Sequence, residues 1–154
     1  YKIKSMTENI LGNPTSSIED DLETLRVNIK CKPTFANVSL MQPYPGTEIC
    51  NIAIKSNEYN PVHIDKMTSF FSTSLLNIKN REERENLQIL FGIAVRHPAL
   101  YSYIRLLIKI KSLKWFYGLI YNIWRPYILI YKVIPLKPTI RELFWMTRRY
   151  LFYK

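Results

Sequence analysis

A helix between two apolar runs is the feature that most constrains the fold of this chain. Ser16 and Glu19 have the spacing of a capping box, and acidic residues crowd the first turn that follows. Pro33 ends the helical pattern. The sequence therefore predicts a helix that begins near Ser17. It buries one face, on which apolar residues recur at helical spacing: Ile18, Leu22, Leu25 and Ile29.

The runs before and after this helix, residues 3–11 and 35–41, are predicted strands. The second run is largely apolar without alternation, which is typical of a parallel strand that is buried on both faces. Each run ends at strand-breaking residues, Gly12-Asn13-Pro14 after the first and Pro43 to Gly46 after the second. Thr47 can cap a following helix. We expect a right-handed βαβ crossover whose strands end side by side, at the edge where open α/β sheets and barrels bind ligands.

Residues 8–49 resemble a known enzyme family. The spacing of Gly and Pro at the strand ends does not by itself indicate a function, because these are also common turn residues. Gly12-x-Pro14, the acidic helix start, Lys32-Pro33 and the run Gln42 to Thr47 together resemble the fifth and sixth strand segments of a radical S-adenosylmethionine enzyme barrel. The branch is the one that often carries an N-terminal cobalamin-binding domain. Residues 81–100 resemble, more weakly, the helices after that barrel.

The resemblance implies a site for S-adenosylmethionine at the strand ends. On one side the implied cofactor-binding residues are Ile10, Gly12 and Pro14, of which Ile10 and Gly12 present backbone and an apolar face to the adenine. Three form the facing wall, Met41, Pro43 and Tyr44, and Gln42 makes a polar contact to cofactor or substrate. One departure is that many members have Gly-Glu after Gly-x-Pro, where this chain has Thr15-Ser16.

Cysteine usage is the largest departure from the family pattern. The superfamily holds its 4Fe-4S cluster with three cysteines spaced C-x-x-x-C-x-x-C, and this chain has only Cys31 and Cys50. Their separation fits neither a cluster nor a zinc site, so we expect two unpaired thiols. The chain also starts at Tyr1 rather than Met. We therefore expect a C-terminal piece of a longer enzyme whose N-terminal part is its partner and carries the cluster ligands and any cobalamin domain. No catalytic residue or metal ligand is expected in this chain.

Composition divides the chain into three parts. Residues 1–57 are the expected C-terminal part of the barrel, 58–100 a linker and a helix that packs on the barrel, and 101–154 a basic, aromatic-rich helical tail. Asn80 and Glu83 have capping spacing, and the helix they begin has an apolar face that runs toward Pro98: Leu87, Leu90, Phe91 and Ala94. The expected fold class is α/β, a partial (β/α) barrel of about its last two strands followed by an all-helical extension.

The tail carries the whole net charge of +10. Residues 101–154 contain 11 Lys/Arg and the single acid Glu142, whereas residues 1–100 contain 11 of each sign. Residues 101–112 split into a polar face and an apolar face with Tyr103, Ile104, Leu107 and Ile110. Residues 115–131 are nearly all apolar, but Arg125-Pro126 interrupts them, and a membrane span needs about 20 apolar residues.

Three interpretations of the tail stay open at this point. It binds an anionic membrane surface, with aromatic rings at the interface and cations on phosphates. It packs against the barrel, with its basic residues solvated. Nucleic acid is the least favoured partner, because the aromatic residues alternate with Ile and Leu rather than with Gly, Ser or Arg.

The resemblance implies cluster-dependent reduction of S-adenosylmethionine to a 5′-deoxyadenosyl radical, or methyl transfer through cobalamin. The tail favours a lipid or other hydrophobic substrate, and a cytoplasmic enzyme peripheral to the inner face of the cell membrane. The alternatives are a non-catalytic remnant or interaction module, or an RNA-modifying relative. The sequence has no P-loop, G-x-G-x-x-G or Ser/His/Asp pattern.

Overall fold

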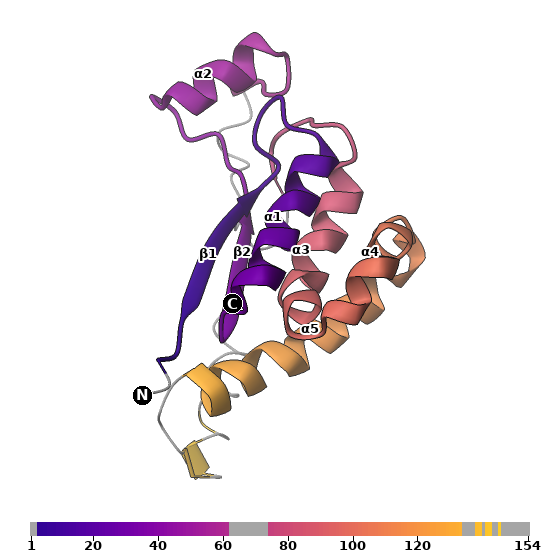
Figure 1. The fold of residues 1–154 in the computed structure, drawn as a ribbon. Coiled ribbons are helices and arrows are strands. Elements are labelled where there is room, and N and C mark those ends of the chain that lie inside the picture. Colours follow the sequence, from indigo (N-terminus) through magenta and orange to yellow (C-terminus); the bar gives the residue numbers. More distant parts are fainter. Residues whose placement is uncertain (1–2, 62–73, 134–137, 140, 143–144, 146–154) are drawn as a thin grey trace.

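The structure, a computed structural model, describes residues 3–61, 74–133, 138–139, 141–142 and 145. These residues form an α/β fold that contains a two-stranded parallel sheet and helices (Figure 1). Helices α1 and α3 pack on one side of the sheet, α4 and α5 follow α3, and α2 lies at the carboxyl ends of the strands.

The predicted βαβ unit is confirmed. It consists of β1 (Met6–Leu11), α1 (Ile18–Cys31) and β2 (Phe35–Leu40). The strands pair in parallel, with Met6 opposite Phe35 and Leu11 opposite Leu40. β1 is shorter than predicted because it begins at Met6 rather than Ile3, and β2 ends one residue earlier than predicted.

The helix start differs by one residue from the prediction. Ser17, not Ser16, is the N-cap of α1, and its hydroxyl accepts the N–H of Asp20 at 3.3 Å. Asp20 completes the box by accepting the N–H of Ser17 at 2.8 Å. Ser16 instead belongs to the preceding turn, where its hydroxyl donates to the carbonyl of Asn13 at 2.7 Å. The predicted Ser16–Glu19 box is therefore wrong.

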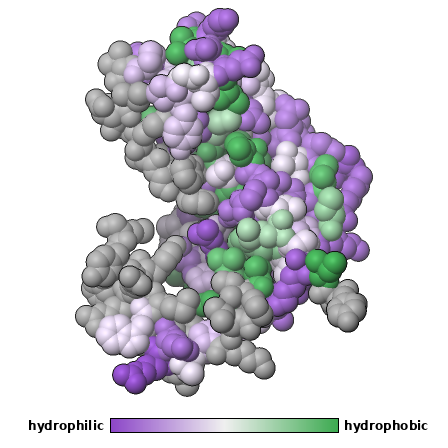
Figure 2. Space-filling model, turned by 90° about the vertical axis from the view of Figure 1, so that its left-hand side faces the viewer, coloured by the Kyte–Doolittle hydropathy of each residue, from purple (hydrophilic) through white to green (hydrophobic). Residues whose placement is uncertain are grey.

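The two faces of the sheet have different environments. Ala36, Val38 and Leu40 are buried in the core against α1 and α3. On the opposite face Met6 and Ile10 are half exposed, and apolar patches alternate with polar residues on the side of the molecule seen in Figure 2. The prediction that β2 is buried on both faces is therefore only partly right, because on its other face Phe35 is buried but Asn37 and Ser39 are half-buried.

Two further helices follow the prediction closely. Thr47 caps α2 (Glu48–Lys55). In α3 (Arg81–Arg96) the predicted apolar face is buried and joins the core. Asn80 does not cap the backbone of α3, because it is in the left-handed conformation, and its side chain donates to the Glu83 carboxylate at 3.0 Å instead.

The tail contains α4 (Tyr101–Leu107) and α5 (Lys114–Ile128), joined through a 3₁₀ turn. Pro126 does not break α5, which continues through it into a π-type turn at Leu129–Val133. The predicted apolar face of α4 is only partly correct, because Ile104 is buried but Tyr103 is 61% exposed. Within the described ranges, no helix combines the length and hydropathy that a membrane crossing requires.

Helix α5 is fixed against the first part of the chain. The ring of Trp124 stacks on that of Phe35, with centroids 6.0 Å apart, and lies against Gly92 of α3. Three tail cations form ion pairs with acids of α1 and α3: Arg105 with Glu19, Lys111 with Glu82, and Lys114 with Glu85. The charge difference between the two parts of the sequence is therefore partly neutralised within the molecule.

Candidate ligand-binding site

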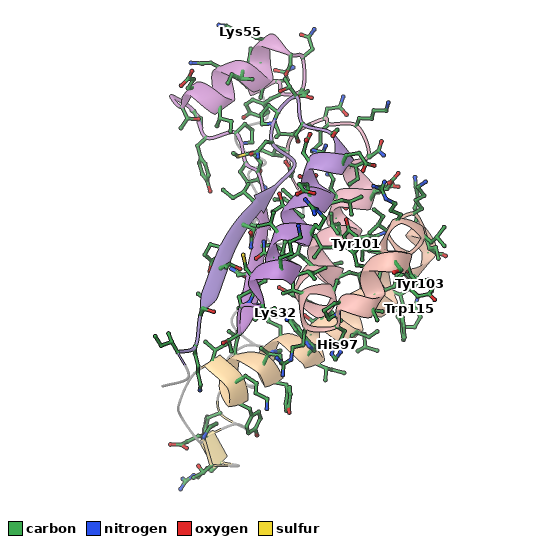
Figure 3. The ribbon with its side chains drawn as sticks, in the orientation of Figure 1. Lys32, Lys55, His97, Tyr101, Tyr103 and Trp115 are labelled. Carbon is green, nitrogen blue, oxygen red and sulfur yellow. The ribbon has the colours of Figure 1, made fainter. Side chains whose placement is uncertain are left out.

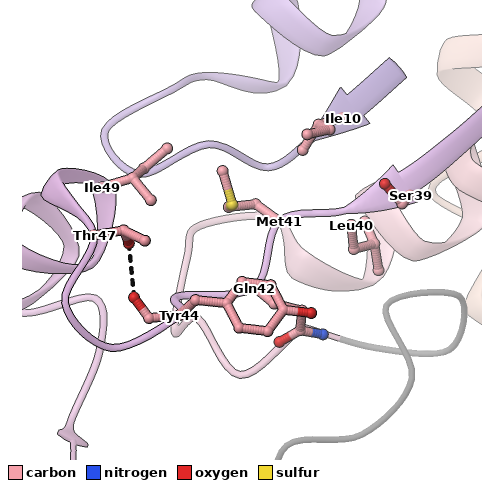
Figure 4. A pocket seen from close by; sticks show the side chains of 8 residues that line it. All are labelled: Ile10, Ser39, Leu40, Met41, Gln42, Tyr44, Thr47 and Ile49. Atoms are coloured by element: carbon pink, nitrogen blue, oxygen red, sulfur yellow. Dashed lines mark hydrogen bonds between the residues drawn. The ribbon is translucent and has the colours of Figure 1, made fainter. Parts of the chain in front are cut away.

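An apolar groove lies at the carboxyl ends of β1 and β2. The ladder extends past the strands, because the N–H of Met41 donates to the Leu11 carbonyl at 2.9 Å. The groove has a volume of about 300 Å³, at the lower end of the range of about 300–1,000 Å³ typical of small-molecule pockets. Its walls, drawn in Figure 4, are formed by Ile10, Ser39, Leu40, Met41, Gln42, Tyr44, Thr47 and Ile49.

The elbow after β2 shapes one wall of the groove. Pro43 and Pro45 cannot donate to a sheet, and Gly46 has the positive φ of +80° that ends the turn. The Thr47 hydroxyl donates to the Tyr44 carbonyl at 2.7 Å and accepts the N–H of Cys50 at 3.3 Å. One threonine therefore fixes both the turn and the start of α2 beside the groove (Figure 4).

The groove is suited to an uncharged, flat group. None of its lining residues is charged. Ile10 and Tyr44 are each about half exposed, at 50% and 48%, so both still have apolar surface that a ligand can cover. Met41 adds a polarisable thioether, which makes favourable contacts with aromatic rings. A nucleobase matches these walls better than a phosphate or a carboxylate, which would need a cation or several N–H donors.

Gln42 has a structural contact that the sequence does not indicate. The residue is 3% exposed, and its side-chain oxygen accepts the N–H of Leu75 at 3.3 Å. Beside it, the Ser74 hydroxyl donates to the Met41 carbonyl at 2.5 Å. These bonds tie the elbow to the segment that precedes α3. The polar contact of Gln42 to a ligand stays a prediction.

The remaining predicted site residues, Gly12, Pro14 and Pro43, are buried and do not line the groove. Gly12 has φ +73°, and a Cβ there would lie 2.9 Å from Cδ1 of Ile78. This glycine is therefore required by the turn itself. The structure brings Ile10, Met41, Gln42 and Tyr44 together in the groove and places the other three in the turns that support it.

A buried ion pair holds the first of these turns in place. Arg84 Nε lies 3.1 Å from Oδ2 of Asp21, and both side chains are almost completely buried. Arg84 also donates to the Ser16 carbonyl at 2.6 Å, and Asp21 accepts the Gly12 N–H at 3.1 Å. Burial raises the pKa of Asp21, although the Gly12 N–H and the Arg84 charge both act to lower it.

Sequence reasoning missed this ion pair, yet a signal for Arg84 was present. Residues 84, 87, 91 and 94 follow the spacing of the apolar face of α3, so Arg84 continues a face that is otherwise buried. A cation on a buried face needs an anion partner. Asp21 was not identifiable in the same way, because it is one of three consecutive acids at the start of α1.

The described residues do not fit an iron–sulfur cluster. Cys31 is exposed at the end of α1, at the edge of the sheet where β2 begins. Cys50 is buried in α2, at the opposite edge. In the part of the chain that the structure describes, no three His, Cys, Asp or Glu side chains are grouped as a metal site would require.

Comparisons of this chain with protein-family models, with curated proteins and with solved structures each gave no match.

Proposed function

We propose that the groove at the ends of β1 and β2 binds the adenosyl part of S-adenosylmethionine, and that the chain is the C-terminal part of a radical S-adenosylmethionine enzyme. The observation that carries this proposal is the position of the groove. It lies where the two segments that resemble that family converge, and Ile10, Met41, Gln42 and Tyr44 line it. The same edge of a parallel sheet is where α/β folds bind their ligands.

The chemistry of the walls supports the adenosyl assignment. Adenine has two apolar faces and a polar edge, and the groove offers Ile10 and Met41 for a face. The role of these residues is to position the ligand and to exclude water from one side of it.

When bound, S-adenosylmethionine and a reducing cluster supply the radical chemistry of this family, and the protein supplies orientation. Because Cys31 and Cys50 lie at opposite edges of the sheet, we assign no cluster contact to this chain. The same proposal includes three further points. The chain forms part of a (β/α) barrel, the cluster ligands lie in another part of the enzyme, and any methyl transfer uses cobalamin. We also propose that the N-terminal part of the enzyme is the partner that contacts the exposed face of the sheet.

A non-catalytic interaction module is the alternative from another class. The described residues supply a groove, and no three His, Cys, Asp or Glu side chains among them are grouped as a metal site requires, which is compatible with a remnant that only binds. RNA modification is a weaker alternative, because Arg105, Lys111 and Lys114 already pair with carboxylates in the same chain.

The test is a titration of the isotope-labelled 154-residue chain with S-adenosylmethionine and with adenosine, followed by amide chemical shifts. We expect weak, saturable binding, with a Kd on the order of 1 mM or below, that moves the amides of Ile10, Ser39 and Met41. Lys32, at the opposite edge of the sheet (Figure 3), should not move. Ile10→Glu places a charge in the apolar groove and should abolish binding.

Ile3→Glu is the matched control, because Ile3 is 89% exposed and outside the groove, so this variant should bind normally. Shifts that persist in Ile10→Glu, or no saturable shift with either ligand, would contradict the adenosyl site. The coding sequence upstream of Tyr1 tests the family separately. An open frame with C-x-x-x-C-x-x-C is expected, and its absence would leave binding in the groove without radical chemistry.

A further inference from the structure

Helix α5 has an exposed apolar face opposite the side that packs on α3. Trp115, Leu119, Ile123 and Tyr127 recur every fourth residue and are 71%, 51%, 67% and 50% exposed. Phe116 and Tyr131 are exposed beside them. We call this set of six residues the outer face of α5. A monomeric protein rarely exposes a contiguous apolar patch of this kind without a partner.

The outer face cannot be buried by a simple rotation of the helix, because α5 is fixed by its other side. Trp124 packs on Phe35 and Gly92, Ile128 is 4% exposed, and the Tyr117 hydroxyl donates to the Leu107 carbonyl at 3.1 Å. Trp115 lies at the outer side of the helical layer, as does Tyr103 of α4 (Figure 3). The exposed face is therefore presented by a docked helix.

Charge distinguishes the possible occupants of this face. Residues 101–133 contain no acid, and the exposed Lys109 and Lys132 lie beyond its two ends. Two copies of the chain that met through α5 would bring two acid-free, basic segments together, since the acids that pair with Lys111 and Lys114 belong to α3. An anionic partner matches these cations. Because the outer face of α5 itself contains no charge, this partner must also accept apolar side chains.

We propose that the outer face of α5 docks on an anionic membrane surface. Its aliphatic residues, Leu119 and Ile123, lie between aromatic residues, with Trp115 at one end and Tyr127 and Tyr131 at the other. This is the arrangement of a helix that lies in the plane of the interface, with its apolar side in the acyl boundary and its rings among the headgroups. Lys109 and Lys132 then face the anionic lipid headgroups.

The docking proposal rests on α5 alone and not on the adenosyl groove. One consequence does rest on the proposed function: an enzyme held in this way draws its substrate from the bilayer, so the substrate is a lipid or lipid-linked molecule. The two proposals fail separately, since vesicle binding requires no S-adenosylmethionine and the titration above requires no lipid.

The experiment measures sedimentation of the 154-residue chain with two kinds of vesicle, phosphatidylcholine alone and an equal mixture with phosphatidylglycerol. We expect binding to the anionic vesicles that high salt weakens but does not remove. Leu119→Ser with Ile123→Ser should lower the partition coefficient by about tenfold per side chain, because each loses apolar contact with the membrane. The matched control is Ile52→Ser with Ile54→Ser, two partly exposed residues of α2, which should bind like the parent chain.

Circular dichroism verifies that both double variants are folded, and emission spectra identify the contact. In a Trp145→Phe background, a blue shift on vesicle binding is expected and should be largely lost when Trp115 is also replaced by Phe, because Trp124 is packed within the molecule. Equal binding by the α5 double variant, or binding that high salt removes completely, would overturn the proposal. A dimer in sedimentation velocity that the α5 double variant dissolves would assign the face to a second copy instead.

Discussion

Arg84 Nε lies 3.1 Å from the Asp21 carboxylate, in a position where both side chains are shielded from water. The pair links α3 to α1, and through the Gly12 N–H it also fixes the turn after β1. The ion pair and its hydrogen bonds to Gly12 and Ser16 therefore hold the turn behind the groove in place. Breaking a buried pair by removing one partner costs more than the pair contributes as a unit, because the other charge stays buried.

Asp21→Ala should reduce the free energy of unfolding by about 3–5 kcal/mol, because the buried Arg84 guanidinium and the Gly12 N–H both lose their acceptor oxygens. Arg84→Met should cost less, since Asp21 can take up a proton. The double variant should be more stable than Asp21→Ala alone. Urea unfolding at neutral pH measures all three. Strict additivity of the two single effects would contradict a direct interaction.

Asp20 and Asp21 are neighbours whose pKa values should move in opposite directions. Bonds from Ser17 lower the pKa of Asp20, so its contribution to stability is present above the usual pKa of Asp and is lost as pH falls through its own lower value. Burial raises the pKa of Asp21, so its ionisation destabilises the folded state as pH rises from the usual Asp pKa through the raised value.

Carboxyl carbon chemical shifts followed against pH measure both residues in one sample. Asp20→Asn should remove stability mainly above the usual Asp pKa, and Ser17→Ala should return the pKa of Asp20 toward its ordinary value. Ser17→Ala should also cost about 1 kcal/mol through the lost cap. Titration of both carboxyls at one common pH would show that the pair around Asp21 is solvated.

Gly92 and Gly118 provide a matched pair of helical glycines. A Cβ at Gly92 would lie 2.7 Å from the Trp124 ring and 3.1 Å from the Ala36 carbonyl oxygen, whereas a Cβ at Gly118 meets no atom within 4 Å. Gly92→Ala should therefore destabilise the protein by about 1–3 kcal/mol and shift the emission of Trp124. Gly118→Ala should stabilise it by about 0.5–1 kcal/mol. Equal effects in denaturant unfolding would mean that α5 is not docked at Gly92.

The two thiols should differ in reactivity. Cys31 is exposed and should react with a thiol reagent in the folded chain, whereas Cys50 should react only on unfolding. Cys31→Ser should leave no thiol that reacts before unfolding. Anaerobic reconstitution of the chain with iron and sulfide should give no stable cluster spectrum, because the described residues bring no three ligands together. A stable cluster with turnover would overturn the assignment of the cluster ligands to another part of the enzyme.

Local patterns predicted the elements that depend on one segment. The apolar spacing of α3 and the Pro/Gly elbow before Thr47 were sufficient, because the periodicity of a buried face and a capping residue can each be recognised within one segment. The start of α1 shows the limit of this approach. Ser16–Glu19 and Ser17–Asp20 both have capping spacing, and the choice is made by Asn13 and Arg84, which hold Ser16 in the turn.

Interactions between distant segments could not be predicted from the patterns. The ion pairs of Arg105, Lys111 and Lys114 join the tail to acids of α1 and α3, and no local feature indicates which charge meets which. For the same reason the groove was predicted only in part. Ile10 and Met41 follow from strand ends, whereas the contact of Gln42 with Leu75 depends on a segment more than 30 residues away.

The packing of α3 on β2 determines when this chain can hide its apolar surface during synthesis. The βαβ unit leaves the ribosome before α3, the helix whose Leu87 and Phe91 cover its sheet. Ala36 and Val38 therefore remain open to other chains until α3 has emerged. In the interval between translation of β2 and of α3, aggregation through this apolar face competes with folding.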